Sequence, residues 1–133
     1  DADYMGSTLD AVDLNGLALK SISAGKQHTC VLLHNHQVKC WGSYAYGKLG
    51  RPGDEVLGDT ANEMGSALPS VPLGSGHQVQ ALSARSSHTC SLLSSGQVKC
   101  WGRNDDGQLG LADGNHRGDD ANEMGDILPA VDL

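Results

Sequence analysis

The sequence predicts an all-β protein that consists of two tandem repeats of about sixty residues each. Residues 16–73 and 76–133 align without a gap, and 28 of the 58 aligned positions are identical. Each copy holds several short apolar stretches separated by turn residues, a pattern typical of short strands. The chain has 18 glycines and only 4% aromatic residues, which is little for a conventional core but enough for small sheets joined by many turns.

The repeat is defined by two blocks that recur in the same order. The first runs from His-Thr-Cys at 28–30 to Val-Lys-Cys-Trp-Gly at 38–42, and the second is Ala-Asn-Glu-Met-Gly at 61–65. Residues 5–14 echo the tail of this repeat, so we expect the chain to begin and end within a repeat. We therefore divide the chain into a first unit with a partial preceding tail, residues 1–67, and a second unit with the start of a third, residues 68–133.

Each unit is predicted to form four short strands. The expected strands are residues 11–14, 19–24, 28–33 and 37–41 in the first unit, and residues 71–73, 79–84, 88–93 and 97–101 in the second. The Asn15-Gly16 pair predicts a tight turn between the first two strands, because both residues tolerate positive φ. Pro69 and Pro129 precede a first strand, where a missing N–H costs little.

The last two strands of each unit are predicted to form a hairpin whose register can be derived. A three-residue loop at 94–96 places Gly96 in the left-handed position that such loops require. Alternation outward from this loop then sets Leu92 opposite Val98 and Cys90 opposite Cys100, with His88 on the same face. In the first unit Leu32 faces Val38 and Cys30 faces Cys40, and His36 takes the place of the loop glycine.

The register brings the cysteines together in pairs. Directly opposed residues at non-hydrogen-bonded sites have Cα atoms about 4.5 Å apart, which a disulfide accepts. We therefore expect two disulfides, Cys30–Cys40 and Cys90–Cys100, and an oxidising compartment. Two alternatives remain open, namely reduced thiols in a cytosolic protein, and zinc sites that add a nearby histidine to each pair.

These motifs resemble the regulator of chromosome condensation repeat. The resemblance rests on the Ala-Gly strand end, the His-Thr strand, the Trp-Gly strand and the turn Asn-Asp-Asp-Gly-Gln-Leu-Gly at 104–110; the last has drifted to Tyr-Ala-Tyr-Gly-Lys-Leu-Gly at 44–50. It implies a β-propeller, commonly of seven four-stranded blades, of which two units would form a partial, open part. The cysteines mark a variant form of the repeat. The exchange-factor activity of nuclear members depends on a complete propeller, so we do not transfer it.

The recurring histidines and tryptophans are interpreted as structural residues of the repeat. His28 and His88 start a strand that is expected to bond neighbouring backbone between blades, and Trp41 and Trp101 are expected to pack within or between blades. A cysteine held in a disulfide is no nucleophile, so we predict no catalytic residue. We also predict no cofactor and no metal site, and leave open a weak cation site near Asp105 and Asp113.

Charge and hydropathy limit the classes of partner. The net charge is −7 and the nine basic residues are scattered, which disfavours a nucleic-acid surface. No run of 18 apolar residues exists, so no membrane-spanning segment is expected. No signal-peptide pattern stands at the start, although such segments are removed from mature proteins.

We therefore predict a non-enzymatic structural or protein–protein interaction module, an accessory subunit or fragment of a larger assembly that binds other protein subunits. The expected location is extracellular or an oxidising lumen such as that of the thylakoid. The alternatives are a cytoplasmic regulatory propeller, either exchange-factor-like or an adaptor of the ubiquitin pathway, and a metal-binding protein.

Overall fold

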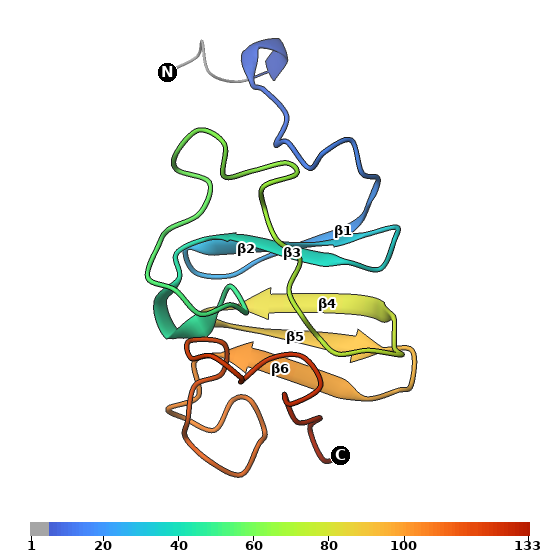
Figure 1. Cartoon of the computed structure of the whole chain (residues 1–133), viewed down its shortest axis with the longest axis vertical. Helices are drawn as coiled ribbons and strands as arrows, with labels where there is room; N and C mark the ends of the chain where they lie inside the picture. The colour runs from blue at the N-terminus through green and yellow to red at the C-terminus, as the bar shows by residue number, and fades with distance from the viewer. Residues whose placement is uncertain (1–5) are drawn as a thin grey trace.

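The computed structural model describes residues 6–133 and shows two small antiparallel sheets stacked face to face (Figure 1). Met5, where the partial head copy begins, lies outside the described residues. The first sheet contains β1 (Leu19–Ala24), β2 (His28–Leu33) and β3 (Val38–Gly42), in that order. The second sheet repeats this order with β4 (Val79–Arg85), β5 (His88–Leu93) and β6 (Val98–Gly102). We call each sheet with its following loop a blade.

The hairpin register is the one that the sequence predicts. Leu32 pairs with Val38 and Cys30 pairs with Cys40, and the second blade repeats both pairs. The loop residue His36 has a φ of 67°, and its counterpart Gly96 has a φ of 86°, so both occupy the left-handed region. Leu33 N–H donates to the Gln37 carbonyl at 2.9 Å and closes the hairpin.

The prediction of four strands per blade is wrong by one strand. Residues 11–14 and 71–73 form no strand of their own. Ser70 forms an isolated antiparallel bridge with Lys39, and Val71 N–H donates to the Val38 carbonyl at 2.7 Å. The segment predicted to open the second unit therefore lies along the outer edge of the first sheet. A single bridge forms because Pro69 and Pro72 have no N–H with which to extend a ladder.

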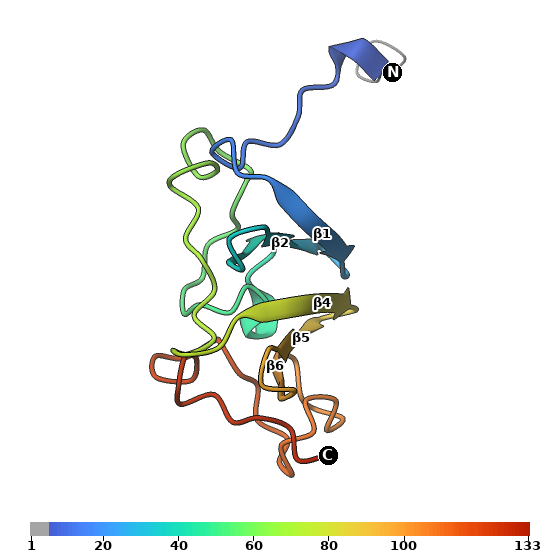
Figure 2. The ribbon, with the colours of Figure 1, turned by 90° about the vertical axis from the view of Figure 1, so that its right-hand side faces the viewer.

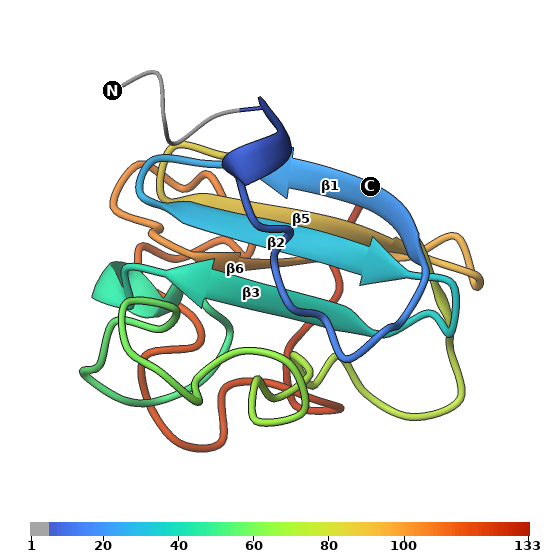
Figure 3. The same ribbon diagram turned by 90° about the horizontal axis from the view of Figure 1, so that it is seen from above.

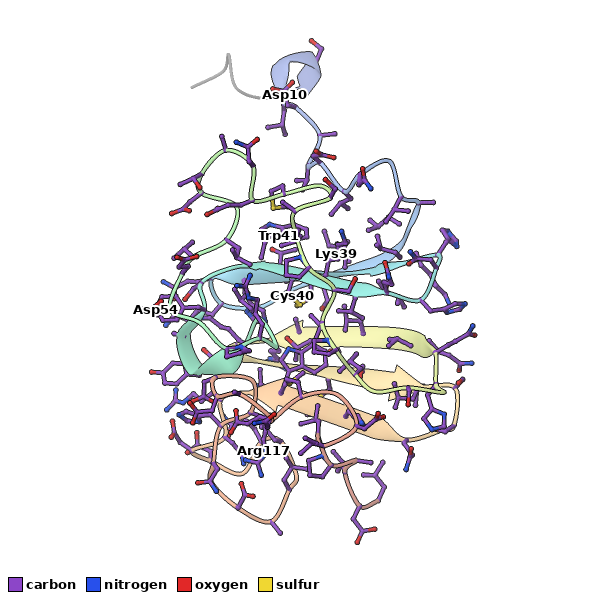
Figure 4. The ribbon with its side chains drawn as sticks, in the orientation of Figure 1. Asp10, Lys39, Cys40, Trp41, Asp54 and Arg117 are labelled. Atoms are coloured by element: carbon purple, nitrogen blue, oxygen red, sulfur yellow. A yellow bond between two sulfur atoms is a disulfide. The ribbon has the colours of Figure 1, made fainter. Side chains whose placement is uncertain are left out.

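The core lies between the two sheets. The inward face of the first sheet carries Leu32, Val38 and the Cys30–Cys40 disulfide, and it packs against the second sheet, where Trp101 is fully buried. Figure 4 shows that Cys40 points toward the second sheet, whereas Lys39 and Trp41 point away from it. This is the alternation expected along a β-strand.

Two long connectors follow the sheets, residues 51–67 after the first and residues 111–127 after the second. In Figures 2 and 3 both connectors run along the side of the stack where β3 and β6 lie, away from β1 and β4. Leu57 bridges Gly42, and Arg117 bridges Gly102 in the same way, so each connector is tied to the end of its own sheet. No helix in residues 6–133 has both the length and the apolar character needed to cross a membrane.

Candidate protein-interaction surface

The four cysteines form two disulfides, Cys30–Cys40 and Cys90–Cys100, each with an S–S distance of 2.08 Å. No cysteine of the chain is free. A sulfur in a disulfide is not available as a nucleophilic thiolate or as a zinc ligand. Each bond instead links the second and third strands of its sheet, β2 to β3 in the first blade and β5 to β6 in the second.

His28 links the two blades. Its Nε2 lies 2.9 Å from the Thr89 hydroxyl oxygen of the second blade, whereas we expected a bond to backbone. The ring is 3% exposed, and this burial lowers the pKa of His28 to about 4. The ring is therefore neutral near pH 7, and its second nitrogen, Nδ1, is buried without a hydrogen-bond partner.

The counterparts of these residues lie at the two ends of the stack and are less covered. His88 is half-buried, and burial, followed by the nearby Arg85 charge, lowers its pKa. Trp101 is buried between blades and its indole N–H donates to the Lys48 carbonyl at 3.2 Å. Trp41, at the equivalent place in the first blade, remains partly exposed. Of the four repeat residues, His28 and Trp101 therefore make contacts between the blades, whereas His88 and Trp41 lie at the ends of the stack.

A glutamate orders each connector. Glu63 Oε2 accepts hydrogen bonds from the backbone N–H groups of Gly58 at 2.7 Å and Thr60 at 3.1 Å. Glu123 repeats this with the N–H groups of Gly118 at 2.9 Å and Asp120 at 3.0 Å. A hydrogen bond from the Thr60 side chain, followed by those from the backbone N–H groups of Thr60 and Gly58, lowers the pKa of Glu63, because these bonds favour its charged form. The Glu-Met-Gly block recurs in both copies because this cap is part of the repeat.

Two buried lysines anchor the ends of the connectors to the sheets. Lys39 Nζ donates to the Gly65 carbonyl at 3.0 Å, and Lys99 Nζ donates to the Gly125 carbonyl at 2.8 Å and to the Leu73 carbonyl at 3.1 Å. Both ammonium groups replace lost water contacts with backbone oxygens. This role was not predicted from the sequence, although the recurrence of both lysines in the Val-Lys-Cys-Trp block was a signal.

The second connector also packs against the first blade. A Cβ at Gly47, in the short 3-10 turn η3 (Ala45–Gly47), would lie 2.4 Å from the Asp119 nitrogen, and one at Gly118 would lie 2.6 Å from the Gly47 carbonyl. Both positions therefore require glycine. Beside them, the rings of Tyr46 and His116 meet edge to face with centroids 5.2 Å apart. The connectors and the sheets consequently form one continuous packed unit.

The turn after β6 is closed by local hydrogen bonds. Asn104 is buried; its side-chain oxygen accepts from Leu109 N–H at 2.9 Å and its amide group donates to the Asp113 carbonyl at 2.9 Å. Arg117 pairs with the Asp113 carboxylate at 2.7 Å and is the main cause of its lowered pKa. Across the described residues, no group of three His, Cys, Asp or Glu side chains is arranged to hold a metal ion.

The negative charge of the chain is concentrated on the connectors. Residues 51–67 and 111–127 together contain nine acidic and two basic residues, a net charge of −7 that equals the net charge of the whole chain. In Figure 4, Asp54 lies on the first connector and projects outward, and Arg117 lies on the second. The second connector lines an open polar hollow of about 520 Å³, whose residues include Asp105, Asp119 and Glu123. This side of the stack is an acidic, ordered loop surface, which we call the connector surface.

Comparison with known proteins places both blades in one repeat family. The model of the regulator of chromosome condensation (RCC1) repeat matches residues 19–47 and 79–108. The chain is 29% identical over 114 residues to the ultraviolet-B receptor UVR8 of Arabidopsis thaliana, which covers 85% of this chain and 24% of the receptor. It is 33% identical over 94 residues to Protein RCC1 of Candida albicans, which covers 70% of this chain and 20% of that protein.

A solved structure gives the same fold. Prp20p of Saccharomyces cerevisiae, described with its binding properties to Gsp1p and histones, superposes with a TM-score of 0.62 at 18% identity, over 90% of this chain and 26% of the other. The chain thus spans about a quarter or less of the relatives it matches. With its disulfide-closed hairpins and partial propeller, the chain belongs to the RCC1 repeat family, as a cysteine-containing variant.

Proposed function

We propose that the chain is a non-enzymatic protein-docking module whose connector surface binds a basic region of a partner protein. The observation that carries this proposal is the concentration of the whole net charge of −7 on residues 51–67 and 111–127. Clustered carboxylates attract basic surfaces and speed their encounter, whereas they repel the phosphates of nucleic acids.

The order of the connectors supports the same role. Glu63 and Glu123 hold backbone N–H groups inside each loop, and Lys39 and Lys99 anchor the loop ends. A loop that is already ordered loses less conformational entropy when a partner binds. Loops held on a rigid scaffold are also the usual place for binding residues.

The relatives support a regulatory interaction module at a general level. One is named as a receptor, and the yeast neighbour is described with its binding to Gsp1p and histones. Because the chain spans a quarter or less of their lengths, the activities of the complete proteins are not transferred. The two disulfides favour an oxidising compartment as the place where this module works, as part of a larger assembly.

A binding experiment with a defined basic protein tests the proposal. The chain is titrated into a fluorescently labelled histone H2A–H2B dimer, which serves as the basic probe, at low ionic strength and at about 0.15 M salt. We expect binding that weakens with salt, and a further several-fold loss in the variant Asp119→Asn/Asp120→Asn.

The matched control is Asp10→Asn/Asp132→Asn, which removes the same charge from exposed residues outside the connectors. It should bind almost as tightly as the unmodified chain. An equal loss in both variants would show that net charge alone drives binding, and absence of binding at low salt would reject a basic partner.

A further inference from the structure

The loop after β3 lacks the contacts that close the equivalent loop after β6. In the second blade the buried Asn104 donates to the Asp113 carbonyl at 2.9 Å, and Arg117 pairs with the Asp113 carboxylate at 2.7 Å. At the three equivalent positions of the first blade, 44, 53 and 57, the chain has tyrosine, glycine and leucine. Without the buried amide and the carboxylate, the first loop cannot be tied to itself in the same way.

The loop of the first blade surrounds a hollow of about 250 Å³, lined by Tyr44, Leu49 and residues 51–55. A second hollow of about 390 Å³ adjoins it, because Leu49, Arg51 and Pro52 line both. The second hollow is lined mainly by apolar residues, among them Val71. All lining residues of both hollows lie within residues 40–72, so neither end of the chain forms part of this site.

Arg51 supplies the site with a positive charge. Its side chain is half-buried, and none of the three ion pairs within residues 6–133 involves it. A Cβ at Gly53 would lie 3.9 Å from Arg51 Nη2, so the guanidinium group lies beside the backbone that lines the hollow. A guanidinium group in this position can bind a carboxylate through two parallel N–H bonds.

Asp54 and Glu55 bring negative charge to the same hollow. Both are exposed, and Figure 4 shows Asp54 on the first connector. A ligand with only a carboxylate would be repelled by these two residues, and a ligand with only a cation would be repelled by Arg51. An α-amino acid carries both charges on one carbon atom and therefore complements both.

These three charges are specific to the first copy of the repeat. The second copy has Leu111, Gly114 and Asn115 at the equivalent positions and forms the same blade. The fold therefore does not require the charges of Arg51 and of its acidic neighbours, which leaves them available to a ligand.

We propose that this site binds a free α-amino acid with an apolar side chain. Arg51 binds the carboxylate, Asp54 and Glu55 attract the ammonium group, and the apolar side chain packs against Leu49 and enters the second hollow. An apolar lining with a few polar groups that fix orientation is usual for small-molecule sites, and the first hollow lies below the roughly 300–1,000 Å³ typical of drug-sized ligands. This inference does not depend on a basic partner for the connector surface.

An NMR titration of the full chain with L-leucine tests the proposal. We expect saturable shifts of the amide signals of Leu49, Gly53 and Val71, with a dissociation constant of about 1 mM or below. Isocaproate lacks the ammonium group of leucine, and isoamylamine lacks its carboxylate. Each should bind at least about tenfold more weakly than L-leucine, because one charged partner is missing.

Arg51→Leu and Arg85→Leu form a matched pair of variants. The first introduces the residue type that the second blade has at this position, Leu111, and should bind L-leucine at least about tenfold more weakly. The second removes the same charge from an exposed residue of β4 and should bind like the unmodified chain. In Asp54→Asn/Glu55→Gln the preference for L-leucine over isocaproate should disappear.

The amide signals outside the site check that each variant is folded. Absence of saturable shifts at the three amides, or unchanged affinity for L-leucine in Arg51→Leu, would overturn the proposal. Equal affinities of the unmodified chain for L-leucine and isocaproate would overturn it as well, because the acidic residues would then recognise no ammonium group.

Discussion

His28 of the first blade and Thr89 of the second blade share a hydrogen bond of 2.9 Å between Nε2 and Oγ1, inside the interface of the two sheets. The Cys30 sulfur lies 3.8 Å from the same hydroxyl. The histidine of the first His-Thr-Cys block therefore bonds the second blade, and it does so through the threonine of the second His-Thr-Cys block. This explains why the three residues recur together.

The buried histidine makes stability depend on pH. Burial lowers the pKa of His28 from 6.5 to about 4, so the unfolded chain takes up a proton at a higher pH than the folded chain. The contribution of neutral His28 to the unfolding free energy is therefore fully present above pH 6.5 and is lost as the pH decreases toward 4. Between about pH 7.5 and pH 5 we expect a loss of about 1 to 2 kcal/mol from this group.

The measurement is urea unfolding of the chain and of His28→Gln across that pH range. The unfolding free energy of the variant should depend less steeply on pH. A weaker dependence should remain, because the pKa of His88 is lowered in the same direction as that of His28. The lowered carboxyl pKa values of Glu63, Asp113 and Asp126 act mainly below this range, where these groups become protonated. Identical pH dependence in both proteins would show that His28 is not held neutral by burial.

The two disulfides should differ in their access to reductant. Cys30 and Cys40 are 0% and 2% exposed because the second blade covers them, whereas Cys90 is partly exposed on the outward face of the second sheet. Under limiting reductant we expect Cys90–Cys100 to be reduced first. Alkylation followed by peptide mass spectrometry gives the order, and prior labelling of Cys30 and Cys40 would contradict the blade arrangement.

Loss of either disulfide should lower stability by about 3 kcal/mol, because each closes a short loop in the unfolded chain. The variants are Cys30→Ser/Cys40→Ser and Cys90→Ser/Cys100→Ser, compared by urea unfolding. The first should lose more, since its cysteines lie in the packed interface and their replacements place hydroxyl groups there. A larger loss from the second pair would argue against the interface described.

The Lys99→Met variant tests the anchoring of the second connector. It retains the long apolar side chain but removes the ammonium group that binds the Leu73 and Gly125 carbonyls. We expect a loss of about 1–3 kcal/mol in unfolding free energy, because these buried oxygens lose their charged donor. The control Lys20→Met changes an exposed lysine and should lie within about 0.5 kcal/mol of the unmodified chain. Equal stabilities of the two variants would contradict an anchoring role for Lys99.

The Glu63→Ala variant tests the cap of the first connector. Its carboxylate accepts from the N–H groups of Gly58, Asp59 and Thr60, and the alanine side chain cannot. Amide hydrogen exchange of these three residues should become faster, while exchange of the corresponding amides in the second connector stays unchanged. Unaltered exchange at Gly58 would show that the loop is ordered by other contacts.

The sequence was sufficient to predict the hairpins and the pairing of the cysteines. Alternation along each strand and the left-handed loop residue fix which residues oppose each other, so Cys30 had to meet Cys40. The prediction of a fourth strand was wrong because the alternation of apolar and polar residues indicates where a strand lies but not which strand it pairs with. Residues 70–71 pair with the preceding sheet, and the flanking prolines limit that pairing to a bridge.

The contacts of the candidate site were harder to predict, because they join residues distant in sequence. The His28–Thr89 bond spans 61 residues, and the Trp101–Lys48 bond spans 53. The recurrence of His28 and Trp101 in both copies indicated a structural role, but it did not indicate which residue either of them contacts. The Glu63 cap is local and could have been inferred from the recurring Glu-Met-Gly block.

Hydrogen–deuterium exchange of the chain with and without the histone dimer tests the central claim most directly. We predict that bound histone slows amide exchange in residues 51–67 and 111–127 and leaves the strands unchanged. Slowing confined to β5 and β6, or binding without any change in the two connectors, would contradict the assignment of the connector surface as the docking site.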